Sequence, residues 1–196
     1  MSNSSSGGPQ QRRGNTRQRI QDVALELFAE QGYEKTSLRE IAERLEVTKA
    51  ALYYHFKTKE DIIISVFDDS TRPIDELIAW AQEQPPTLEM KREVLRRYSE
   101  AMAAGAQLYR FMQENQATMR ELSIGETVKR RLFTLVELLR TEEGPLTDQV
   151  RCVSALFTLH AGMMFLQHVE GDPEETRQAA LEVATDLITQ AHHEVG

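Results

Sequence analysis

The stretch from Thr36 to Asp61, TSLREIAERLEVTKAALYYHFKTKED, contains two short amphipathic segments separated by a very tight turn. Thr36 or Ser37 can cap a first helix, and Glu40, three residues after Ser37, completes a capping box. Thr48 can cap a second helix that runs to about Phe56. The first helix has one apolar stripe at helical spacing, formed by Leu38, Ile41, Ala42 and Leu45. Two helices joined this closely cannot pack antiparallel, so the stretch is typical of a helix-turn-helix.

The second helix has an outer face that is unusual for so short a segment. This face carries hydroxyls, an ammonium and an imidazole, from Thr48, Lys49, Tyr53, Tyr54 and His55. Such groups are the partners that phosphate oxygens and base edges need. Leu52 and Phe56 point the other way and are expected in the core. The pattern favours DNA binding over a generic helical pair with a solvated polar face.

The order of hydrophobic, aromatic and cap residues resembles the DNA-binding domain of TetR-family transcriptional regulators, over roughly residues 17–62. The residues that carry the resemblance are Ile41-Ala42, Val47-Thr48, Leu52-Tyr53, His55-Phe56 and Lys59-Glu60, and upstream Ile20, Ala24, Leu27, Phe28 and Gly32-Tyr33. Glu46 is a departure, because the family usually has glycine in this turn. A residue other than glycine in a left-handed conformation costs about 1 kcal/mol.

The resemblance implies that the second helix of the motif enters the major groove of DNA. The residues expected to contact base edges or the groove are Thr48, Lys49, Ala50 and Tyr53. The residues expected to hold phosphates are Tyr54, His55 and Lys59, with Ser37 and Arg17 contributing from the flanks. Two-fold symmetry of the protein predicts a roughly palindromic operator.

Charge is distributed unevenly along the chain, whose net charge is −8. Residues 1–57 carry nine basic and seven acidic residues, a net of +2. Residues 58–196 carry fourteen against twenty-four, a net of −10. An acidic body is repelled by phosphate and helps to point the other end at DNA. The distribution therefore supports an N-terminal DNA-binding domain.

The sequence predicts an all-α fold of about nine helices in three parts. Residues 1–16 are rich in Ser, Gly and Gln and are expected to form a disordered basic arm. Residues 17–62 are expected to form the DNA-binding domain, with the helix-turn-helix at 37–56, and residues 63–196 a larger helical regulatory and dimerisation domain. Pro73 is expected to interrupt a helix, so that a separate piece begins at Ile74.

Two long helices are expected near the C-terminus, from Thr147 to Val169 and from Pro173 to about His193. The resemblance implies that such helices pair with their copies in a four-helix dimer interface. The first of them is apolar on two faces, so it needs a cover besides its own core, although burial of both faces within one subunit is the alternative. The seams expected at the interface of a homodimer comprise Cys152, Leu156, Leu159, Met163 and Leu166, and Leu181, Ala184 and Ile188.

Methionine and aromatic side chains are numerous in the regulatory part, and they suit an apolar ligand cavity as well as an ordinary core. The residues expected to bind a ligand are Tyr98, Met102, Tyr109, Phe111, Met112, Phe133, Phe157 and Met164. No cluster of inward basic residues is evident. A lipophilic or aromatic small-molecule effector is therefore expected rather than a sugar phosphate.

No catalytic motif is present, so neither an enzyme nor a cofactor is predicted. His160, Met164 and His168 share one helical face, as in some metal sensors, but core or interface packing is the simpler interpretation and no metal site is predicted. No apolar run is long enough to span a membrane and the N-terminus lacks an apolar signal core, so a cytoplasmic protein is expected.

These observations predict a homodimeric DNA-binding transcriptional regulator that a small ligand releases from its operator. A repressor is expected, because repression is the usual mode of the family that the sequence resembles. Two alternatives remain at this point. One is a regulator controlled by a protein partner or by metal, and the other is a helical interaction module without DNA binding.

Overall fold

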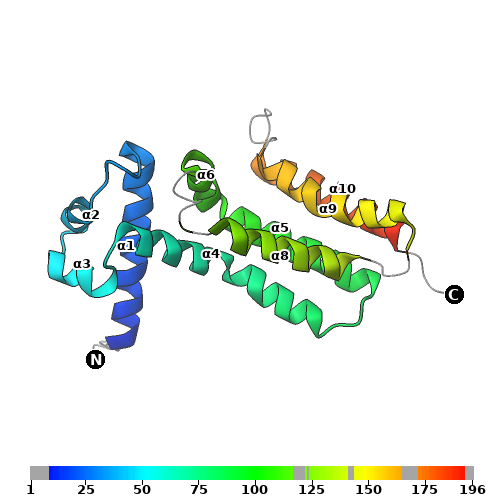
Figure 1. Cartoon of the computed structure of the whole chain (residues 1–196), viewed down its shortest axis with the longest axis horizontal. Helices are drawn as coiled ribbons and strands as arrows, with labels where there is room; N and C mark the ends of the chain where they lie inside the picture. The colour runs from blue at the N-terminus through cyan, green and yellow to red at the C-terminus, as the bar shows by residue number, and fades with distance from the viewer. Residues whose placement is uncertain (1–8, 117–121, 123, 141–143, 165–171, 193–196) are drawn as a thin grey trace, which may run out of the picture. The chain divides into compact units, whose positions relative to one another are not determined.

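The computed structural model describes residues 9–116, 122, 124–140, 144–164 and 172–192, and every regular element in these ranges is a helix (Figure 1). The predicted all-α fold is confirmed. With the labels of Figure 1, the helices are α1 (Pro9–Gln31), α2 (Leu38–Arg44), α3 (Lys49–His55), α4 (Lys59–Gln82), α5 (Leu88–Ala104), α6 (Ala106–Glu114), α8 (Ile124–Leu139), α9 (Leu146–Met164) and α10 (Pro173–Ala191).

The chain forms two compact units. The first, called here the head, comprises the described residues of Met1–Asp69 and Leu108–Leu122, and the second, the body, those of Ser70–Gln107 and Ser123–Gly196. The head thus extends past the predicted boundary at residue 62 and takes in most of α6. Sequence reasoning placed Phe111 in a ligand cavity, whereas its ring lies 5.6 Å from that of Phe28 and 6.0 Å from that of Tyr33, inside the head.

The core of the head is built from the apolar sides of α1 to α4. Its most deeply buried side chains are Ile20, Ile41, Leu52, Phe56, Ile62 and Ile63. Helix α1 ends at Gly32, whose φ of +93° needs glycine and whose N–H donates to the Phe28 carbonyl at 3.0 Å.

Helix α1 begins earlier than predicted, because residues 9–16 are helical rather than part of a disordered arm. Proline suits the first turn of a helix, where its missing N–H costs nothing. The Gln and Arg residues that follow Pro9 are good helix formers, and the helix that starts at the folded segment can extend through them. Composition alone indicated disorder because these residues bring no apolar surface to a core.

Helix α4 continues through Pro73, so the prediction of two separate pieces was wrong. Proline has no N–H to donate to the carbonyl four residues earlier, here that of Asp69, and its ring crowds that carbonyl. Phe67 and Leu77 are buried on either side of the proline, at 3% and 2% exposed. Packing of the flanking turns therefore outweighs the loss of one helical hydrogen bond.

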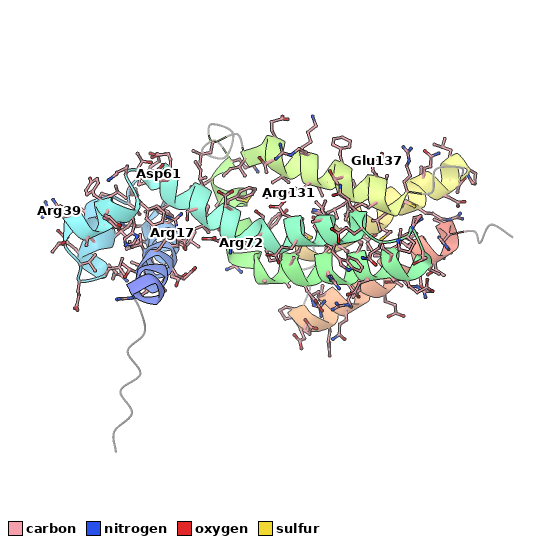
Figure 2. All side chains as sticks on the ribbon, turned by 90° about the horizontal axis from the view of Figure 1, so that it is seen from below. Arg17, Arg39, Asp61, Arg72, Arg131 and Glu137 are labelled. Carbon is pink, nitrogen blue, oxygen red and sulfur yellow. The ribbon has the colours of Figure 1, made fainter. Side chains whose placement is uncertain are left out.

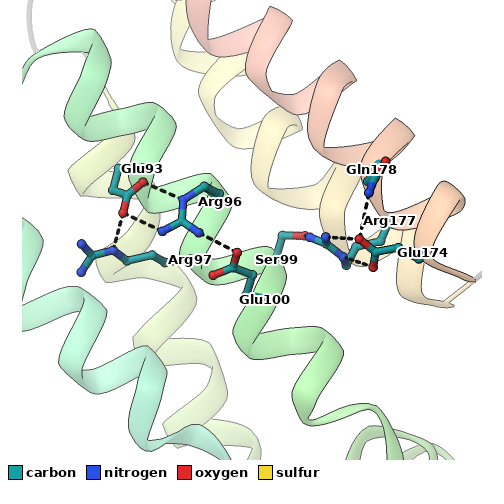
Figure 3. A network of polar contacts seen from close by, with 8 residues as sticks. All are labelled: Glu93, Arg96, Arg97, Ser99, Glu100, Glu174, Arg177 and Gln178. Atoms are coloured by element: carbon teal, nitrogen blue, oxygen red, sulfur yellow. Dashed lines mark hydrogen bonds and ion pairs between the residues drawn. The ribbon is translucent and has the colours of Figure 1, made fainter.

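The body is a helical bundle in which α5, α8, α9 and α10 share one core (Figure 1). A Cβ atom added at Gly162 of α9 would lie 2.8 Å from the Cβ of Ala180, so glycine permits the close approach of α9 and α10. On the surface of α5, Glu93, Arg96 and Arg97 form an ion-pair network (Figure 3).

Candidate nucleic-acid interface

The capping box predicted at the start of α2 is present. The Glu40 N–H donates to Ser37 Oγ at 3.2 Å, and the N–H and hydroxyl of Ser37 each donate to Glu40 Oε2 at 2.7 Å. The hydrogen bond from the Ser37 hydroxyl is the main reason that the pKa of the Glu40 carboxyl lies below its usual value. Ile41 and Ala42 are buried on the opposite side of the helix. The start of α2 is therefore fixed by its own residues.

The turn between α2 and α3 closes as a Schellman motif around Glu46. The Glu46 N–H donates to the Glu43 carbonyl at 3.1 Å, and the Val47 N–H donates to the Ala42 carbonyl at 3.0 Å. Glu46 has a φ of 57°, which is the left-handed conformation that usually selects glycine at this position. The turn thus forms without the glycine that sequence reasoning found missing, at a cost of about 1 kcal/mol.

Helix α3 presents its polar face to the outside. Thr48 caps the helix by accepting from the Ala51 N–H at 3.2 Å. Leu52 and Phe56 are buried and fix the inner side of α3 on the core of the head. The predicted contact residues that are exposed on or beside α3 are Thr48, Lys49, Ala50, Tyr53 and Tyr54, while His55 is half-buried. Tyr54 is 67% exposed and its ring packs edge-on against that of His55.

The start of α4 follows α3 directly and is capped in the same way. Thr58 Oγ1 accepts from the Asp61 N–H at 3.0 Å, and Asp61 Oδ2 accepts from the Thr58 N–H at 3.0 Å. Lys59 was predicted to hold a phosphate, but its ammonium donates to the Tyr33 carbonyl at 2.8 Å and lies 4.3 Å from the centre of the Tyr33 ring. The Tyr33 hydroxyl in turn donates to Glu60 Oε1 at 2.8 Å. Lys59 therefore has a structural role in the head besides any contact with DNA.

Arg17 is an exposed residue of α1, labelled in Figure 2. Its guanidinium is 4.6 Å from the centre of the ring of Phe56, the residue that ends α3, and its NH2 group donates to Ser65 Oγ at 2.6 Å. The structure thus brings Arg17 beside the end of α3, and its contact with phosphate stays a prediction. Ser37, the other flanking residue, has both its N–H and its hydroxyl engaged by Glu40.

One basic residue of this surface was not singled out from the sequence. Lys57 is exposed immediately after Phe56, and its ammonium donates to the Tyr53 carbonyl at the end of α3. Its position directly between the aromatic end of α3 and the cap of α4 was the signal that could have identified it.

The residues predicted for a dimer interface lie inside the body. Cys152, Leu156, Leu159, Ala184 and Ile188 are each at most 5% exposed within the single chain, and Leu181 packs against the same core. Apart from the partly buried Leu181, these side chains have little surface left to bury against a second chain. Leu166 and the side chain of Met163 lie outside the described residues.

The outward-facing apolar stripe of α9 is instead its other face. Leu146, Val150 and Phe157 lie at helical spacing on one side and are 75%, 55% and 58% exposed, and Val183 of α10 is 51% exposed. These four residues are called here the outer apolar face. Because both faces of α9 are apolar, helical periodicity alone could not show which of them the body covers.

The residues predicted to bind a ligand are scattered. Tyr98 and Met102 belong to the core of the body, and Phe111, Met112 and the half-buried Tyr109 to the part of the chain that forms the head. Phe133 and Phe157 were expected to bind a ligand but are exposed on the surface. The side chain of Met164 lies outside the described residues.

Two polar groups lie in the interior of the body, His160, for which core or interface packing was expected, and Lys91, which was not singled out from the sequence. The Tyr98 hydroxyl and His160 Nε2 are 3.0 Å apart, and His160 Nδ1 is 3.0 Å from the Leu156 carbonyl. Burial lowers the pKa of His160, which favours the neutral ring with Nδ1–H donating to Leu156 and Nε2 accepting from Tyr98. Lys91 is 2% exposed, and burial lowers the pKa of its ammonium.

Within the described ranges, no three His, Cys, Asp or Glu side chains gather as a metal site would require. His168, which was weighed as a metal ligand, lies outside those ranges. None of the described helices is long and apolar enough to cross a membrane.

Comparison with known proteins agrees with this geometry. The family model described as "Bacterial regulatory proteins, tetR family" matches residues 20–66. The HTH-type transcriptional regulator AcrR of Shigella flexneri is 45% identical over 82 residues, which cover 41% of this chain and 38% of AcrR. The HTH-type negative transcriptional regulator IcaR of the biofilm operon icaADBC, from Staphylococcus aureus strain Newman, is 48% identical over 44 residues, 22% of this chain and 24% of IcaR. The chain thus matches well under half the length of these relatives.

Likeness of fold extends over nearly the whole chain. A transcriptional regulator of the TerR/AcrR family from Aquifex aeolicus VF5 superposes with a TM-score of 0.66 at 23% identity, over 85% of this chain and 96% of that one. The relatives named above are described as transcriptional regulators. The helix-turn-helix of α2 and α3 lies within the residues that match the tetR family model, and the all-helical fold of the chain is similar to that of a TerR/AcrR-family regulator.

Proposed function

We propose that the chain is a cytoplasmic, homodimeric repressor that reads a roughly palindromic operator with α3 and leaves it when a small ligand binds. The observation that carries the proposal is the outer face of α3. Thr48, Lys49 and Tyr53 are all exposed on this face, while Leu52 and Phe56 are buried on the opposite side of the helix. A short, capped helix with a polar outer face is the element that helix-turn-helix proteins place in the major groove.

The proposed contacts divide into two classes. Lys49 and its neighbours Thr48, Ala50 and Tyr53 are proposed to read base edges or the groove, and Tyr54, His55 and Arg17 to hold phosphates. Ser37 and Lys59 are also proposed to contact phosphates. Ser37 would share its donors between Glu40 and a phosphate, and Lys59 would share its donors between the Tyr33 carbonyl and a phosphate. Repression is proposed because IcaR, a relative, is described as a negative regulator.

Separate substitutions of Lys49 and Tyr54 test the two classes. Lys49→Ala should relax the sequence preference of the protein in a selection from random duplexes, because a base contact is lost. Tyr54→Phe should weaken binding to all duplexes alike, because only a phosphate contact is lost. Fluorescence anisotropy at several salt concentrations measures both effects. If the chain shows no salt-dependent binding to duplex DNA, the alternative of a helical module without DNA binding is favoured.

The outer apolar face of α9 and α10 is proposed as the surface that a second copy covers. Three large apolar side chains that are each more than half exposed on one helix face are unusual on a monomer surface. A two-fold axis through this face would let the same patch of each copy cover the other.

Sedimentation of Val150→Asp tests this surface, because a buried carboxylate at the centre of an apolar interface is strongly unfavourable. The variant should be monomeric at concentrations at which the unmodified protein is dimeric. Phe133→Asp is the matched control, since Phe133 is a similarly exposed apolar residue on α8. A Val150→Asp protein that stays dimeric would place the interface elsewhere.

The effector is proposed to be lipophilic or aromatic and to enter the body near Tyr98 and His160. Their hydrogen bond is a polar point beside a largely apolar core, and polar groups among apolar side chains are the composition of many ligand sites. Thermal stabilisation by hydrophobic or aromatic compounds, and its loss in Tyr98→Phe, would support the site. Stabilisation only by strongly anionic, polar compounds would contradict it, and stabilisation only by a metal or a partner protein would favour the alternative modes of control.

A further inference from the structure

Two buried partners hold the guanidinium of Arg17 in place. Its NH2 group donates to Ser65 Oγ at 2.6 Å, and its carbon lies 4.6 Å from the centre of the Phe56 ring. Ser65 is 5% exposed and Phe56 2%, so both partners are fixed by the packing around them. Arg17 itself is exposed, and its Nε and NH1 groups donate to no described residue. The side chain is therefore fixed in direction while most of its donors remain available.

Ser65 is in turn held by Gln21. Gln21 Nε2 donates to Ser65 Oγ at 2.6 Å and to Asp69 Oδ2 at 2.7 Å. The Ser65 hydroxyl thus accepts from both Arg17 and Gln21, which uses both of its lone pairs. Gln21 and Arg17 belong to α1, and Ser65 and Asp69 belong to α4.

This network is costly to the fold. Gln21 is 2% exposed, and its Oε1 atom is buried without a hydrogen-bond partner among the described residues. A buried acceptor without a partner is unfavourable, and an apolar side chain of similar size would avoid the penalty. The presence of a glutamine amide at this buried position therefore calls for an explanation other than stability.

We propose that Ser65 and Gln21 are positioning residues that orient Arg17 for a phosphate of the DNA backbone. Binding normally immobilises a long side chain and loses its rotamer freedom. Arg17 has already lost that freedom in the contacts to Ser65 and Phe56, so a phosphate that meets its free donors incurs less of this loss. The proposal rests on the proposed function, because it requires that the head bind DNA.

The test is a double-mutant cycle measured with a mixed-sequence DNA duplex, since a phosphate contact does not depend on sequence. Arg17→Ala should weaken binding and make the dependence of log affinity on log salt shallower by about 0.9 per subunit. Ser65→Ala should weaken binding by about two- to tenfold per subunit while the salt dependence stays unchanged, because the charge is still present. In the Arg17→Ala background, Ser65→Ala should have no further effect.

Ser99→Ala is the matched control. Ser99 is 4% exposed and accepts from Arg177 in the body, so it reproduces the same kind of contact in a part of the chain not proposed to meet DNA. It should leave DNA affinity unchanged. If Ser65→Ala does not fold, Gln21→Met removes the donor that holds Ser65 and should show the same dependence on the Arg17 background.

An equal loss of affinity from Ser65→Ala with and without Arg17 would show general support of the head and overturn the proposal, as would no loss at all. An Arg17→Ala protein with unchanged affinity and salt dependence would also overturn it. In that case, altered sequence preference in Lys49→Ala would still uphold the proposed function. A protein that binds no duplex in a salt-dependent way would overturn both.

Discussion

Arg17 in the head and Arg177 in the body make the same kind of contact and differ in what surrounds it. Each donates to the hydroxyl of a buried serine, Arg17 to Ser65 at 2.6 Å and Arg177 to Ser99 at 3.2 Å. The remaining nitrogens of Arg177 donate to Glu174, at 2.8 Å and 2.5 Å (Figure 3). Arg17 meets no carboxylate among the described residues.

This difference separates a structural arginine from one that is available to a ligand. Arg177 has all three nitrogens engaged within the chain, and its hydrogen bond lowers the pKa of the Glu174 carboxyl to about 2. Three of its five N–H donors are used within the chain, so fewer remain for an outside anion than on Arg17. Both arginines donate to a buried serine, so this contact does not distinguish them. The carboxylate, present beside Arg177 and absent beside Arg17, decides how many donors each arginine can offer to a ligand.

Supplying the missing carboxylate should therefore convert Arg17 into a structural arginine. Gly14 precedes Arg17 by three residues, the spacing at which Glu174 precedes Arg177, and both positions lie in α1. Gly14→Glu should lower affinity for duplex DNA by about tenfold or more, because an ion pair competes with phosphate and a negative charge is added nearby. Anisotropy titrations at constant salt measure the change.

Gly14→Gln is the control for this substitution. Both variants replace a helix-interior glycine and should stabilise α1 by about 1 kcal/mol at most. Only the glutamate can pair with Arg17. Equal DNA affinities of the two variants would show that the guanidinium is not in contact with phosphate.

The two arginines should also differ in their effect on stability. Arg177→Ala removes the partner of buried Ser99 and the tie between α10 and α5, and should cost about 1–2 kcal/mol of unfolding free energy. Arg17→Ala should cost less, about 0.5–1 kcal/mol of unfolding free energy. Gln21 still donates to Ser65 in this variant, and the cation–π contact that is lost involves an exposed guanidinium. Urea denaturation of each variant measures both values. A larger loss from Arg17→Ala would mean that its main role is structural.

The contrast between head and body also shows how far sequence reasoning could go. The capping box of Ser37 and Glu40 and the cap at Thr48 could be read from the sequence, because each depends on residues within a few positions of one another. The left-handed Glu46 was indicated only by the resemblance to a family that usually has glycine in this turn. The exposed face of α3 followed, since only one of its sides is apolar. The helix caps and the exposed side of α3 were thus predictable from local sequence.

The body was predictable as helices but not as surfaces. Both Cys152 and Val150 lie on apolar faces of α9, and only contacts with helices distant in sequence decide that the first is buried and the second exposed. Phe111 joins the aromatic rings of the head although more than seventy residues separate it from them. Ser65 looked like an ordinary polar residue in α4, and its contact with Arg17 spans 48 positions. Long-range packing of this kind leaves no periodic signal in the sequence.

The ion-pair network of Glu93, Arg96 and Arg97 should lower the stability of the body at acid pH. Glu93 accepts from Arg96 at 2.8 Å and from Arg97 at 2.6 Å (Figure 3), and the hydrogen bond from Arg96 is the main cause that lowers its pKa to about 2. Because the unfolded chain binds this proton at higher pH than the folded one, stability is present above about pH 4.5 and falls as the pH drops toward 2.

Thermal melts between pH 6 and 2, taken in steps, should show a smaller fall for Glu93→Gln than for the unmodified chain, by no more than about 1 kcal/mol, because the pair is partly exposed. High salt should reduce the difference by screening the pair. An identical pH profile for the two proteins would mean that the network adds nothing to stability.

Glu46 is the acidic counterpart of Arg17, a charged side chain of the head with no described ionic partner, and its substitution should have the smallest effect. Glu46→Gly removes the left-handed strain of about 1 kcal/mol, but glycine also increases the entropy of the unfolded chain by about 0.4–1 kcal/mol. Stability should therefore rise by well under 1 kcal/mol in urea denaturation. Glu46→Asn separates backbone from charge, because asparagine tolerates this conformation while both variants remove the carboxylate that follows α2. If both raise DNA affinity equally at low salt, the charge opposes phosphate, whereas a rise with glycine alone would show that the shape of the turn limits how α3 meets DNA.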